Sequence, residues 1–273
     1  MAAAETRSLT GLSAVRGFLL DMDGTFYVGE QLVEGALEFI DRLRQQGREF
    51  LFLTNNSSKD AEQYAAKLAR LGLPVPPEKI LTSGDATASY LHGVRPGARV
   101  YVVGTAALEA EFQSRGFTLT DTEPDYIVVG FDTTLSYAKL WLLCDLARAG
   151  VPYIATHPDI NCPTETGFMP DIGATIAYVR TATGREPDLV IGKPNRLIAE
   201  QAALRLNLPL ESLCMVGDRL YTDIALGAAG LPTVLVLSGE SKREDIPAAA
   251  HQPTFVFEHL GALEEALQQL QRL

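Results

Sequence analysis

The sequence predicts an α/β protein: a parallel sheet forms its core, and a second α/β domain interrupts it. Short and nearly continuous apolar runs alternate with stretches of helical periodicity, which is typical of parallel strands covered on both faces. Polar and acidic motifs follow several of these runs, where ligands bind in open α/β sheets. The middle of the chain has its own βα rhythm over roughly 100 residues, enough for a separate core.

The first part of the chain alternates strands and helices. Its expected elements are a strand at 17–20, a helix at 34–46, a strand at 49–53 and a helix at 58–71. Apolar residues recur at helical spacing in the first of these helices, and a glycine follows each helix, as is common at helix ends. Ser57 or Ser58 is the expected N-cap of the second helix. Residues 1–16 are interpreted as a short leader into the first strand.

The last part repeats this rhythm, and the middle part has one of its own. The last part is expected to contain strands at 188–191, 213–216, 233–237 and 254–257 and helices at 195–206, 223–229 and 260–270. The middle is expected to contain strands at 100–103, 126–129 and 153–155 and a helix at 136–149. We therefore assign residues 1–83 and 188–273 to a core domain and 84–187 to an inserted α/β cap domain.

Composition narrows the classes of partner and the compartment. The chain has 273 residues and a net charge of −11 without a Lys/Arg cluster, which argues against a nucleic acid partner. No apolar run approaches the roughly 20 residues of a membrane helix, so no membrane partner is expected. Cys144, Cys162 and Cys214 are odd in number and widely spaced, which favours reduced thiols in the cytoplasm over disulfides or a zinc site.

The most specific feature is a carboxylate pair, Asp21 and Asp23, just beyond the first apolar strand. Gly24 allows the chain to turn away sharply after the pair. Two close carboxylates repel each other unless a cation lies between them or one is protonated. Either condition suits catalysis by a nucleophile beside a general acid and base. The alternative is a turn with a helix-capping aspartate.

Three further motifs lie at expected strand ends. The segment 54–58, Thr-Asn-Asn-Ser-Ser, supplies hydroxyls, amides and backbone N–H groups at a helix start, where anions bind. Lys193 stands between an apolar strand and a helix that Pro194 can begin, and would neutralise phosphate charge there. Asp218 follows a later strand, and Asp223 could complete an oxygen-rich Mg²⁺ site or simply cap a helix.

The order of these motifs, DMDGT at 21–25, TNNSS at 54–58, GKP at 192–194 and GDRLYTD at 217–223, resembles the haloacid dehalogenase (HAD) superfamily of phosphohydrolases. A domain of roughly 100 residues between the second and third motifs is similar to the NagD-like branch, which includes nitrophenyl phosphatases, nucleotidases and sugar-phosphatases. The resemblance covers residues 17–82 and 188–240, and the cap through the segment 155–159 and the helix start at Gly173. It implies a Rossmann-like core with a cap.

The resemblance also implies roles for individual residues. Asp21 would be the nucleophile that forms an aspartyl-phosphate, and Asp23 would protonate the leaving group and then activate water. Asp21, Asp218 and the backbone carbonyl of Asp23 would bind Mg²⁺, with Asp223 in its outer shell. The substrate- and phosphate-binding residues would be Thr54, Asn55, Asn56, Lys193, His157 and Asn195. Thr54 and Lys193 would also take part in catalysis.

The expected substrate is a small phosphorylated metabolite. Asp23 favours phosphate chemistry over dehalogenation, because an alkoxide needs a proton to leave and a halide does not. Substrate contacts are expected on the polar loop 157–171, where His157 would either donate to the substrate or cap the loop. Sugar phosphates, glycerol phosphate, phosphoglycolate and nucleoside monophosphates stay open, with p-nitrophenyl phosphate as an artificial substrate. The resemblance also implies a homodimer through the cap.

Three other classes remain as alternatives. A phosphotransferase or mutase would share every core residue and pass the phosphoryl group to a second substrate. A non-catalytic module that binds phosphorylated ligands would be expected to lack Asp21 or Asp23, and both are present. A nicotinamide-dependent dehydrogenase would need a GxGxxG motif after the first strand, and none is there.

Overall fold

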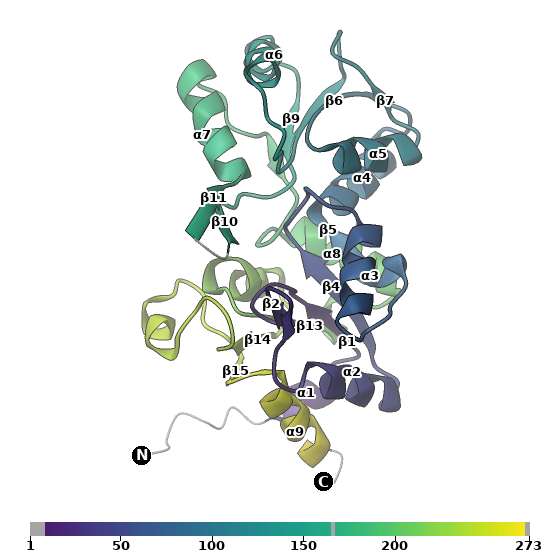
Figure 1. The fold of residues 1–273 in the computed structure, drawn as a ribbon, viewed down its shortest axis with the longest axis vertical. Helices are drawn as coiled ribbons and strands as arrows, with labels where there is room; N and C mark the ends of the chain where they lie inside the picture. Colours follow the sequence, from purple (N-terminus) through teal and green to yellow (C-terminus); the bar gives the residue numbers. More distant parts are fainter. Residues whose placement is uncertain (1–8, 165–166, 271–273) are drawn as a thin grey trace. The chain divides into compact units, whose positions relative to one another are not determined.

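The computed structural model describes residues 9–164 and 167–270, and it has the α/β fold that the sequence predicts (Figure 1). Part of the expected leader, residues 1–8, lies outside the described residues. The chain forms two compact units. The first unit comprises the chain up to Leu53, Ala65–Ile80 and the chain from Ala202 onward, and the second comprises Thr54–Tyr64 and Leu81–Gln201. The second unit thus takes in 54–64, 81–83 and 188–201 as well as the expected cap, whose borders stay a prediction.

A six-stranded sheet in the order β15-β14-β13-β1-β4-β5 forms the centre of the core fold (Figure 1). Its strands are β1 (Gly17–Leu20), β4 (Glu49–Thr54), β5 (Ile80–Thr82), β13 (Leu213–Gly217), β14 (Thr233–Val236) and β15 (Phe255–Phe257). β1 pairs in parallel with β13 and β4, so that Leu20 lies beside Val216 and Phe52. Since parallel strands end at the same edge, the residues that follow β1 and β13 are neighbours in space.

Helices and short turns complete the core fold. The helices are α1 (Thr10–Ser13), α2 (Ala36–Gln45), α3 (Ala61–Arg70), α8 (Arg196–Leu206) and α9 (Leu260–Leu270), with 3₁₀ turns at Pro77–Lys79, Leu210–Ser212 and Arg243–Ala248. A small hairpin joins β2 (Tyr27–Val28) to β3 (Gln31–Leu32). Phe18 of β1 packs edge-on against Phe39 of α2 with ring centroids 5.6 Å apart, so the expected apolar face of this helix lies in the core.

Two expectations for these helices are wrong. The expected helix at 223–229 is a π-helical turn, Leu220–Ile224, followed by a 3₁₀ helix, Ala225–Ala229. The N–H groups of Asp223 and Ile224 both reach the carbonyl of Arg219, which widens the turn. Asp60 caps α3 in place of the expected Ser57 or Ser58, because its carboxylate accepts from the N–H of Gln63 at 2.8 Å.

The second unit contains a five-stranded sheet in the order β12-β9-β8-β6-β7, with parallel pairings throughout. Its strands are β6 (Arg99–Val103), β7 (Thr118–Leu119), β8 (Tyr126–Val129), β9 (Tyr153–Ala155) and β12 (Leu189–Val190). Its helices are α4 (Ser83–Val94), α5 (Ala106–Ser114), α6 (Tyr137–Arg148) and α7 (Ile172–Thr183). Side chains from α6, α7 and the sheet form one buried cluster, so this unit has the separate core that its length predicts.

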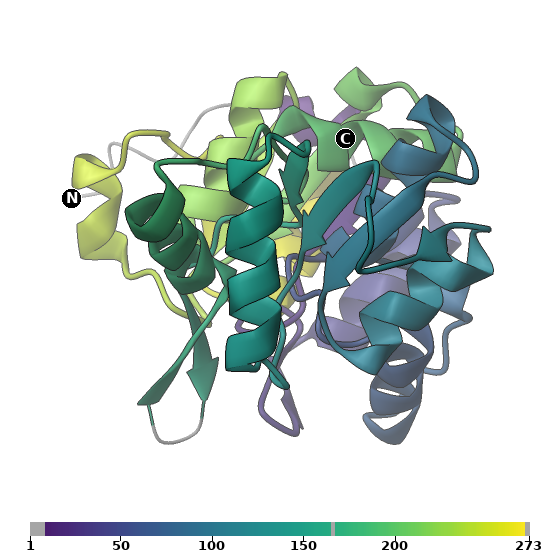
Figure 2. The same ribbon diagram turned by 90° about the horizontal axis from the view of Figure 1, so that it is seen from above.

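An antiparallel hairpin in the second unit occupies the expected polar loop at 157–171. It joins β10 (Asn161–Thr164) to β11 (Gly167–Pro170), and residues 165–166 between them lie outside the described residues. All four residues of β11 are exposed, and the hairpin projects from its unit in Figure 2. Among the described residues, no helix combines the length and apolarity that a membrane span requires.

Candidate functional site

Three buried aspartates come together in the first unit. Asp21 follows β1 and Asp218 follows β13, and the N–H of Asp21 continues the pairing of these strands by donating to Val216 at 2.9 Å. Asp223 joins them from the π-helical turn. Each of the three offers a carboxylate oxygen within 4.8 Å of those of the other two, and none is more than 8% exposed. The adjacency of β1 and β13 therefore unites motifs that lie about 200 residues apart in the sequence.

Glycines make room for these carboxylates. A side chain at Gly24 or Gly239 would overlap the carboxyl group of Asp218, and one at Gly217 would overlap that of Asp223. Gly24 also has φ +90°, a conformation that favours glycine. The acidic cluster therefore needs glycine at these positions for space as well as for backbone geometry.

The negative charge of Asp218 is only partly offset by its hydrogen-bond donors. Thr25 donates its hydroxyl to one carboxylate oxygen at 3.0 Å, and the N–H of Glu240 donates to the other at 2.7 Å. Burial and the neighbouring Asp223 nevertheless raise the pKa of Asp218 to about 6, although these hydrogen bonds and Arg219 act in the opposite direction. A cation beside the cluster would reverse this effect.

Arg219 is the cationic side chain nearest in sequence to this cluster. Its backbone N–H donates to Asp223 at 3.0 Å, and its guanidinium lies 3.0 Å from the carboxylate of Glu240. Burial opposes its charge, but Asp21 and the other nearby acidic groups outweigh burial and raise the pKa of Arg219. Sequence reasoning did not assign a role to Arg219 or Thr25. The available signal was their position inside the DMDGT and GDRLYTD motifs.

Asp23 differs from the three buried aspartates in its exposure to solvent. Its side chain is exposed, and the hydroxyl of Tyr27 donates to it at 3.4 Å. An exposed carboxylate two residues from Asp21 is accessible to a substrate, as a general acid and base must be. The expected contact of its backbone carbonyl with a metal stays a prediction.

The acidic cluster fits a divalent cation. Mg²⁺ prefers oxygen ligands from carboxylates, carbonyls and water. The three residues of the cluster, Asp21, Asp218 and Asp223, each offer a carboxylate oxygen. Burial and the neighbouring Asp223 both disfavour the charge on Asp218 and raise its pKa, and a bound cation would offset both effects. Asp223, expected in the outer shell, lies as close to the group as the two expected ligands do.

In the second unit, the side chain of Asn55 forms hydrogen bonds with both backbone groups of Lys193, its N–H and its carbonyl. Its carbonyl oxygen accepts from the N–H of Lys193 at 2.8 Å, and its amide donates to the Lys193 carbonyl at 2.9 Å. The same amide also donates to Asp159 at 2.9 Å. Asn55 is 5% exposed and Lys193 is 2% exposed. These contacts bring together two motifs that are 138 residues apart.

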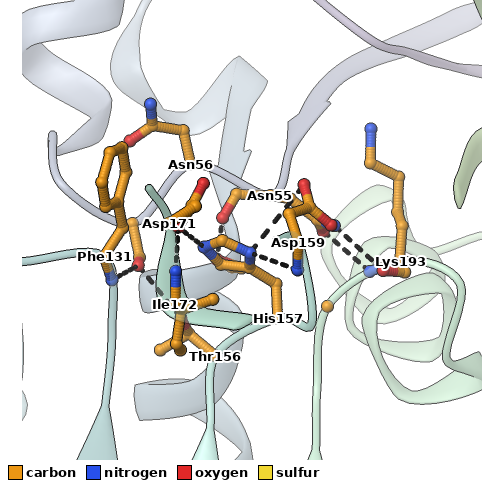
Figure 3. A network of polar contacts seen from close by, with 12 residues as sticks. Asn55, Asn56, Phe131, Thr156, His157, Asp159, Asp171, Ile172 and Lys193 are labelled. Carbon is orange, nitrogen blue, oxygen red and sulfur yellow. Dashed lines mark hydrogen bonds and ion pairs between the residues drawn. The ribbon is translucent and has the colours of Figure 1, made fainter. Parts of the chain in front are cut away.

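His157 lies between two carboxylates in the same unit (Figure 3). Its Nε2 is 3.6 Å from Asp171, and its Nδ1 is 3.9 Å from the carboxylate of Asp159. Nδ1 also accepts from the backbone N–H of Asp159 at 3.4 Å. All three residues are buried. They form a second group in which a histidine and two aspartates face one another, and the direct substrate role of His157 stays a prediction.

The remaining expected phosphate-binding residues make local hydrogen bonds. The Thr54 hydroxyl accepts from the N–H of Asn56 at 3.1 Å. The Asn56 side chain accepts from both the N–H and the hydroxyl of Ser58, at 2.9 and 2.7 Å. Asn195 donates to Gly192 at 3.3 Å. These bonds set the shape of the two loops, and the expected contacts with phosphate stay predictions.

Two family models match the chain. Residues 18–118 match the haloacid dehalogenase-like hydrolases, and residues 190–263 match a second HAD hydrolase-like model. Together they cover all four motifs. The 5'-nucleotidase YutF of Bacillus subtilis is 36% identical over 250 residues, which are 91% of this chain and 97% of that protein.

Solved structures give the same result. A 4-nitrophenylphosphatase from Thermotoga maritima is 44% identical and superposes with a TM-score of 0.92, covering 94% of this chain and 99% of that one. A glycerol phosphate phosphatase from Mycobacterium tuberculosis, in complex with magnesium, is 35% identical with a TM-score of 0.86. That match covers 93% of this chain and 78% of the other.

Proposed function

The chain belongs to the haloacid dehalogenase-like hydrolases and is a phosphatase of that family, and from this premise we propose that it hydrolyses small phosphate monoesters with Mg²⁺ through an aspartyl-phosphate on Asp21. The observation that carries the proposal is the buried group of Asp21, Asp218 and Asp223 at the ends of β1 and β13. Mutually repelling carboxylates in a buried place are costly for stability, and they suit a nucleophile beside a bound cation.

We assign the two steps to the first carboxylate pair. The carboxylate of Asp21 attacks phosphorus, the ester bond breaks, and Asp23 gives its proton to the leaving oxygen. Asp23, now ionised, removes a proton from the water that releases phosphate from Asp21. The exposure of Asp23 and its contact with Tyr27 support this assignment, because the carboxylate is both accessible and oriented.

Mg²⁺ would be held by Asp21, Asp218 and the backbone carbonyl of Asp23, with Asp223 either as a ligand or in the outer shell. When bound, the ion would supply charge that offsets the acidic cluster and the phosphoryl oxygens. Thr54 would donate its hydroxyl to the phosphoryl group, and the Lys193 ammonium would balance its charge. The fixed backbone of Lys193 supports this role, because electrostatic stabilisation depends on charges that are already in place.

The substrate class is a small phosphorylated metabolite. A nucleotidase, a nitrophenylphosphatase and a glycerol phosphate phosphatase are all similar to this chain, so the comparisons support the ester chemistry and not one leaving group. We propose that the hairpin β10–β11 takes part in selecting that group, since it carries exposed Phe168 and Met169 beside polar residues.

We further propose a homodimer that uses the second unit. Tyr137 and Trp141 lie one turn apart on α6 and are 72% and 63% exposed, an unusual exposure for large aromatic side chains. Light scattering should show that Trp141→Glu shifts the protein to monomer, whereas Leu204→Glu, at a 74% exposed position on α8, leaves the mass unchanged. A wild-type monomer would refute this proposal. We also propose a cytoplasmic location, which the odd number and wide spacing of Cys144, Cys162 and Cys214 support.

The function is tested by phosphate release from a panel of esters: p-nitrophenyl phosphate, sugar phosphates, glycerol phosphate, phosphoglycolate and nucleoside monophosphates. Each ester is incubated with wild-type protein in Mg²⁺, with wild-type protein in EDTA, and with Asp21→Asn in Mg²⁺. Release that needs both Mg²⁺ and Asp21 is the expected result. Release that persists in EDTA would refute the metal requirement, and release by clean Asp21→Asn would refute the nucleophile.

A further inference from the structure

The hairpin β10–β11 is anchored at its base by two aspartates. Asp159 precedes β10 and Asp171 follows β11. The backbone closes the base, because Asp171 donates its N–H to Ile160 at 2.9 Å and Gly173 donates to Asp159 at 2.8 Å. Asp171 also caps α7 by accepting from the N–H of Ile172. The position of the hairpin is therefore set where these two aspartates are held.

His157 contacts both anchors with opposite edges of one ring. Nδ1 accepts the N–H of Asp159, and Nε2 on the opposite edge faces the carboxylate of Asp171 at 3.6 Å. The histidine is fully buried, and Figure 3 shows the ring between the two aspartates. One side chain thus links the beginning and the end of the hairpin.

The connection continues from Asp159 to Lys193. Asn55 donates to Asp159 at 2.9 Å and brackets the Lys193 backbone with its two other hydrogen bonds. Gly192 is closely packed between these residues. A Cβ at this position would lie 2.7 Å from the His157 Cβ and 2.7 Å from the side-chain oxygen of Asn55. A displacement of His157 therefore shifts the neighbours that fix the Lys193 backbone.

We propose that His157 is a positioning residue that couples the hairpin β10–β11 to Lys193 through Asp159 and Asn55. The inference rests on the proposed function, in which Lys193 balances phosphoryl charge and the hairpin selects the leaving group. In this arrangement the Asp159 side of the ring sets the position of Lys193, and the Asp171 side sets the position of the C-terminal end of β11 at the base of the hairpin. His157 acts through these neighbours, because its side chain is fully buried.

Two substitutions separate the two sides of the ring. His157→Asn places an amide group near the position of Nδ1 and removes the Asp171 side, whereas His157→Gln places one near the position of Nε2 and removes the Asp159 side. His92→Gln, on the exposed face of α4, is a control for replacing a histidine in the same unit. Each variant is assayed for kcat, KM and inhibition by vanadate, with p-nitrophenyl phosphate and glycerol phosphate as substrates.

We expect His157→Gln to lower kcat about 10- to 100-fold for both esters and to weaken vanadate inhibition by about tenfold, because a misplaced charge costs most in the transition state. We expect His157→Asn to keep kcat within about threefold and to change the ratio of the two KM values. A purely structural role would lower the active fraction in both variants without changing the vanadate inhibition constant. Equal effects of the two substitutions, or no effect of either on an active enzyme, would overturn the proposal.

Hydrogen exchange gives a readout that does not depend on activity. The N–H of Lys193 should lose protection in His157→Gln and keep it in His157→Asn, since only the former releases Asp159 and, with it, Asn55. If the wild-type protein hydrolyses no ester, the proposed function fails, and exchange at Lys193 still decides the coupling. If His157→Gln does not fold, Asp159→Ala replaces it, because it removes the carboxylate that accepts from Asn55 and leaves both contacts of Asn55 with Lys193 in place. Lost protection at Lys193 is then expected, and unchanged protection would overturn the coupling.

Discussion

The first unit gathers like charges, whereas the second unit gathers groups that satisfy one another. Asp21, Asp218 and Asp223 are three buried acids, and burial together with the neighbouring Asp223 raises the pKa of Asp218. Around Asn55, every side-chain hydrogen-bonding atom has a partner in Lys193 or Asp159. The difference indicates that the acidic cluster suits a bound cation, whereas the Asn55 network is satisfied by groups of the protein itself.

The comparison also predicts how each region responds to substitution. Removing a charge from the acidic cluster relieves repulsion, so function is lost while stability is kept or gained. Removing a group from the Asn55 network leaves buried polar atoms without partners, so stability itself falls. Proteins often hold a destabilised arrangement at the site of chemistry and depend on the surrounding structure to maintain it.

The largest expected effect is that of Asp21→Asn. Turnover should fall by at least about 10⁴-fold, because the amide is not a nucleophile, while the melting temperature without metal stays equal to wild type or rises. Steady-state assays and thermal unfolding of the same sample measure the two quantities. A variant that is inactive and also melts well below wild type would show that Asp21 has a structural role that the comparison denies.

The second effect concerns the Asn55 network. Asn55→Ala should lower the free energy of unfolding by about 2–4 kcal/mol, because it removes three buried hydrogen bonds and leaves the Lys193 backbone without its partners. Asn195→Ala is the matched control: the Asn195 side chain donates to Gly192 at 3.3 Å from a partly exposed position, and its loss should cost under about 1 kcal/mol. Urea unfolding measures both, and equal losses would contradict the distinction.

Much of this could be predicted from sequence. The strands β1, β4 and β13 follow from continuous apolar runs, and Asp21 and Asp218 were recognised because acids follow those runs. Helix α4 was missed because its glycine, serine and alanine residues carry no amphipathic period. The π-helical turn at Leu220–Ile224 was missed because it depends on contacts of Arg219 with Asp223.

The network around His157 shows a different limit of sequence reasoning. His157 and Asp159 were visible as residues of a polar loop, but the contact of Asn55 with Lys193 joins positions 138 residues apart. No local pattern encodes that pairing, because the two residues come together only in the folded chain. The same holds for Thr25, which reaches Asp218 across 193 residues.

The third effect tests the space around the acidic cluster. Gly24→Ala should cost about 2–4 kcal/mol, because the new methyl group would overlap Asp218 at a residue with φ +90°. Gly47→Ala is the control: Gly47 has φ +63°, a Cβ there would meet no described atom within 4 Å beyond its chain neighbours, and the change should cost only about 1 kcal/mol for strain. Chemical unfolding measures the free energy of unfolding of both variants. Similar losses would mean that the Asp218 side chain can move aside for the methyl group at little cost.

The smallest effect is a pH-dependent stabilisation by Mg²⁺. Because the folded pKa of Asp218 is raised from 3.8 to about 6, the folded state binds more protons in this range, and stability falls as pH rises through it. Above that range Asp218 is ionised in the folded state too, so its repulsion from Asp223 is fully present, and a bound cation would relieve it. Mg²⁺ should therefore raise the melting temperature by several degrees near pH 7 and by much less near pH 5. An equal rise at both pH values, or a full rise in Asp218→Asn, would argue against this origin.

The central claim, phosphoryl transfer to Asp21, is tested most directly by trapping the phospho-enzyme. Asp23→Asn is mixed with p-nitrophenyl phosphate and Mg²⁺, quenched in acid and digested for mass spectrometry. Nitrophenolate is a stable anion that leaves without a proton, so the first step should proceed while the second, which needs Asp23 as base, stalls. We predict one phosphoryl group on the peptide that contains Asp21, and none in Asp21→Asn. A phosphoryl group on another residue, or nitrophenol release with no phosphoprotein at any time, would contradict the account.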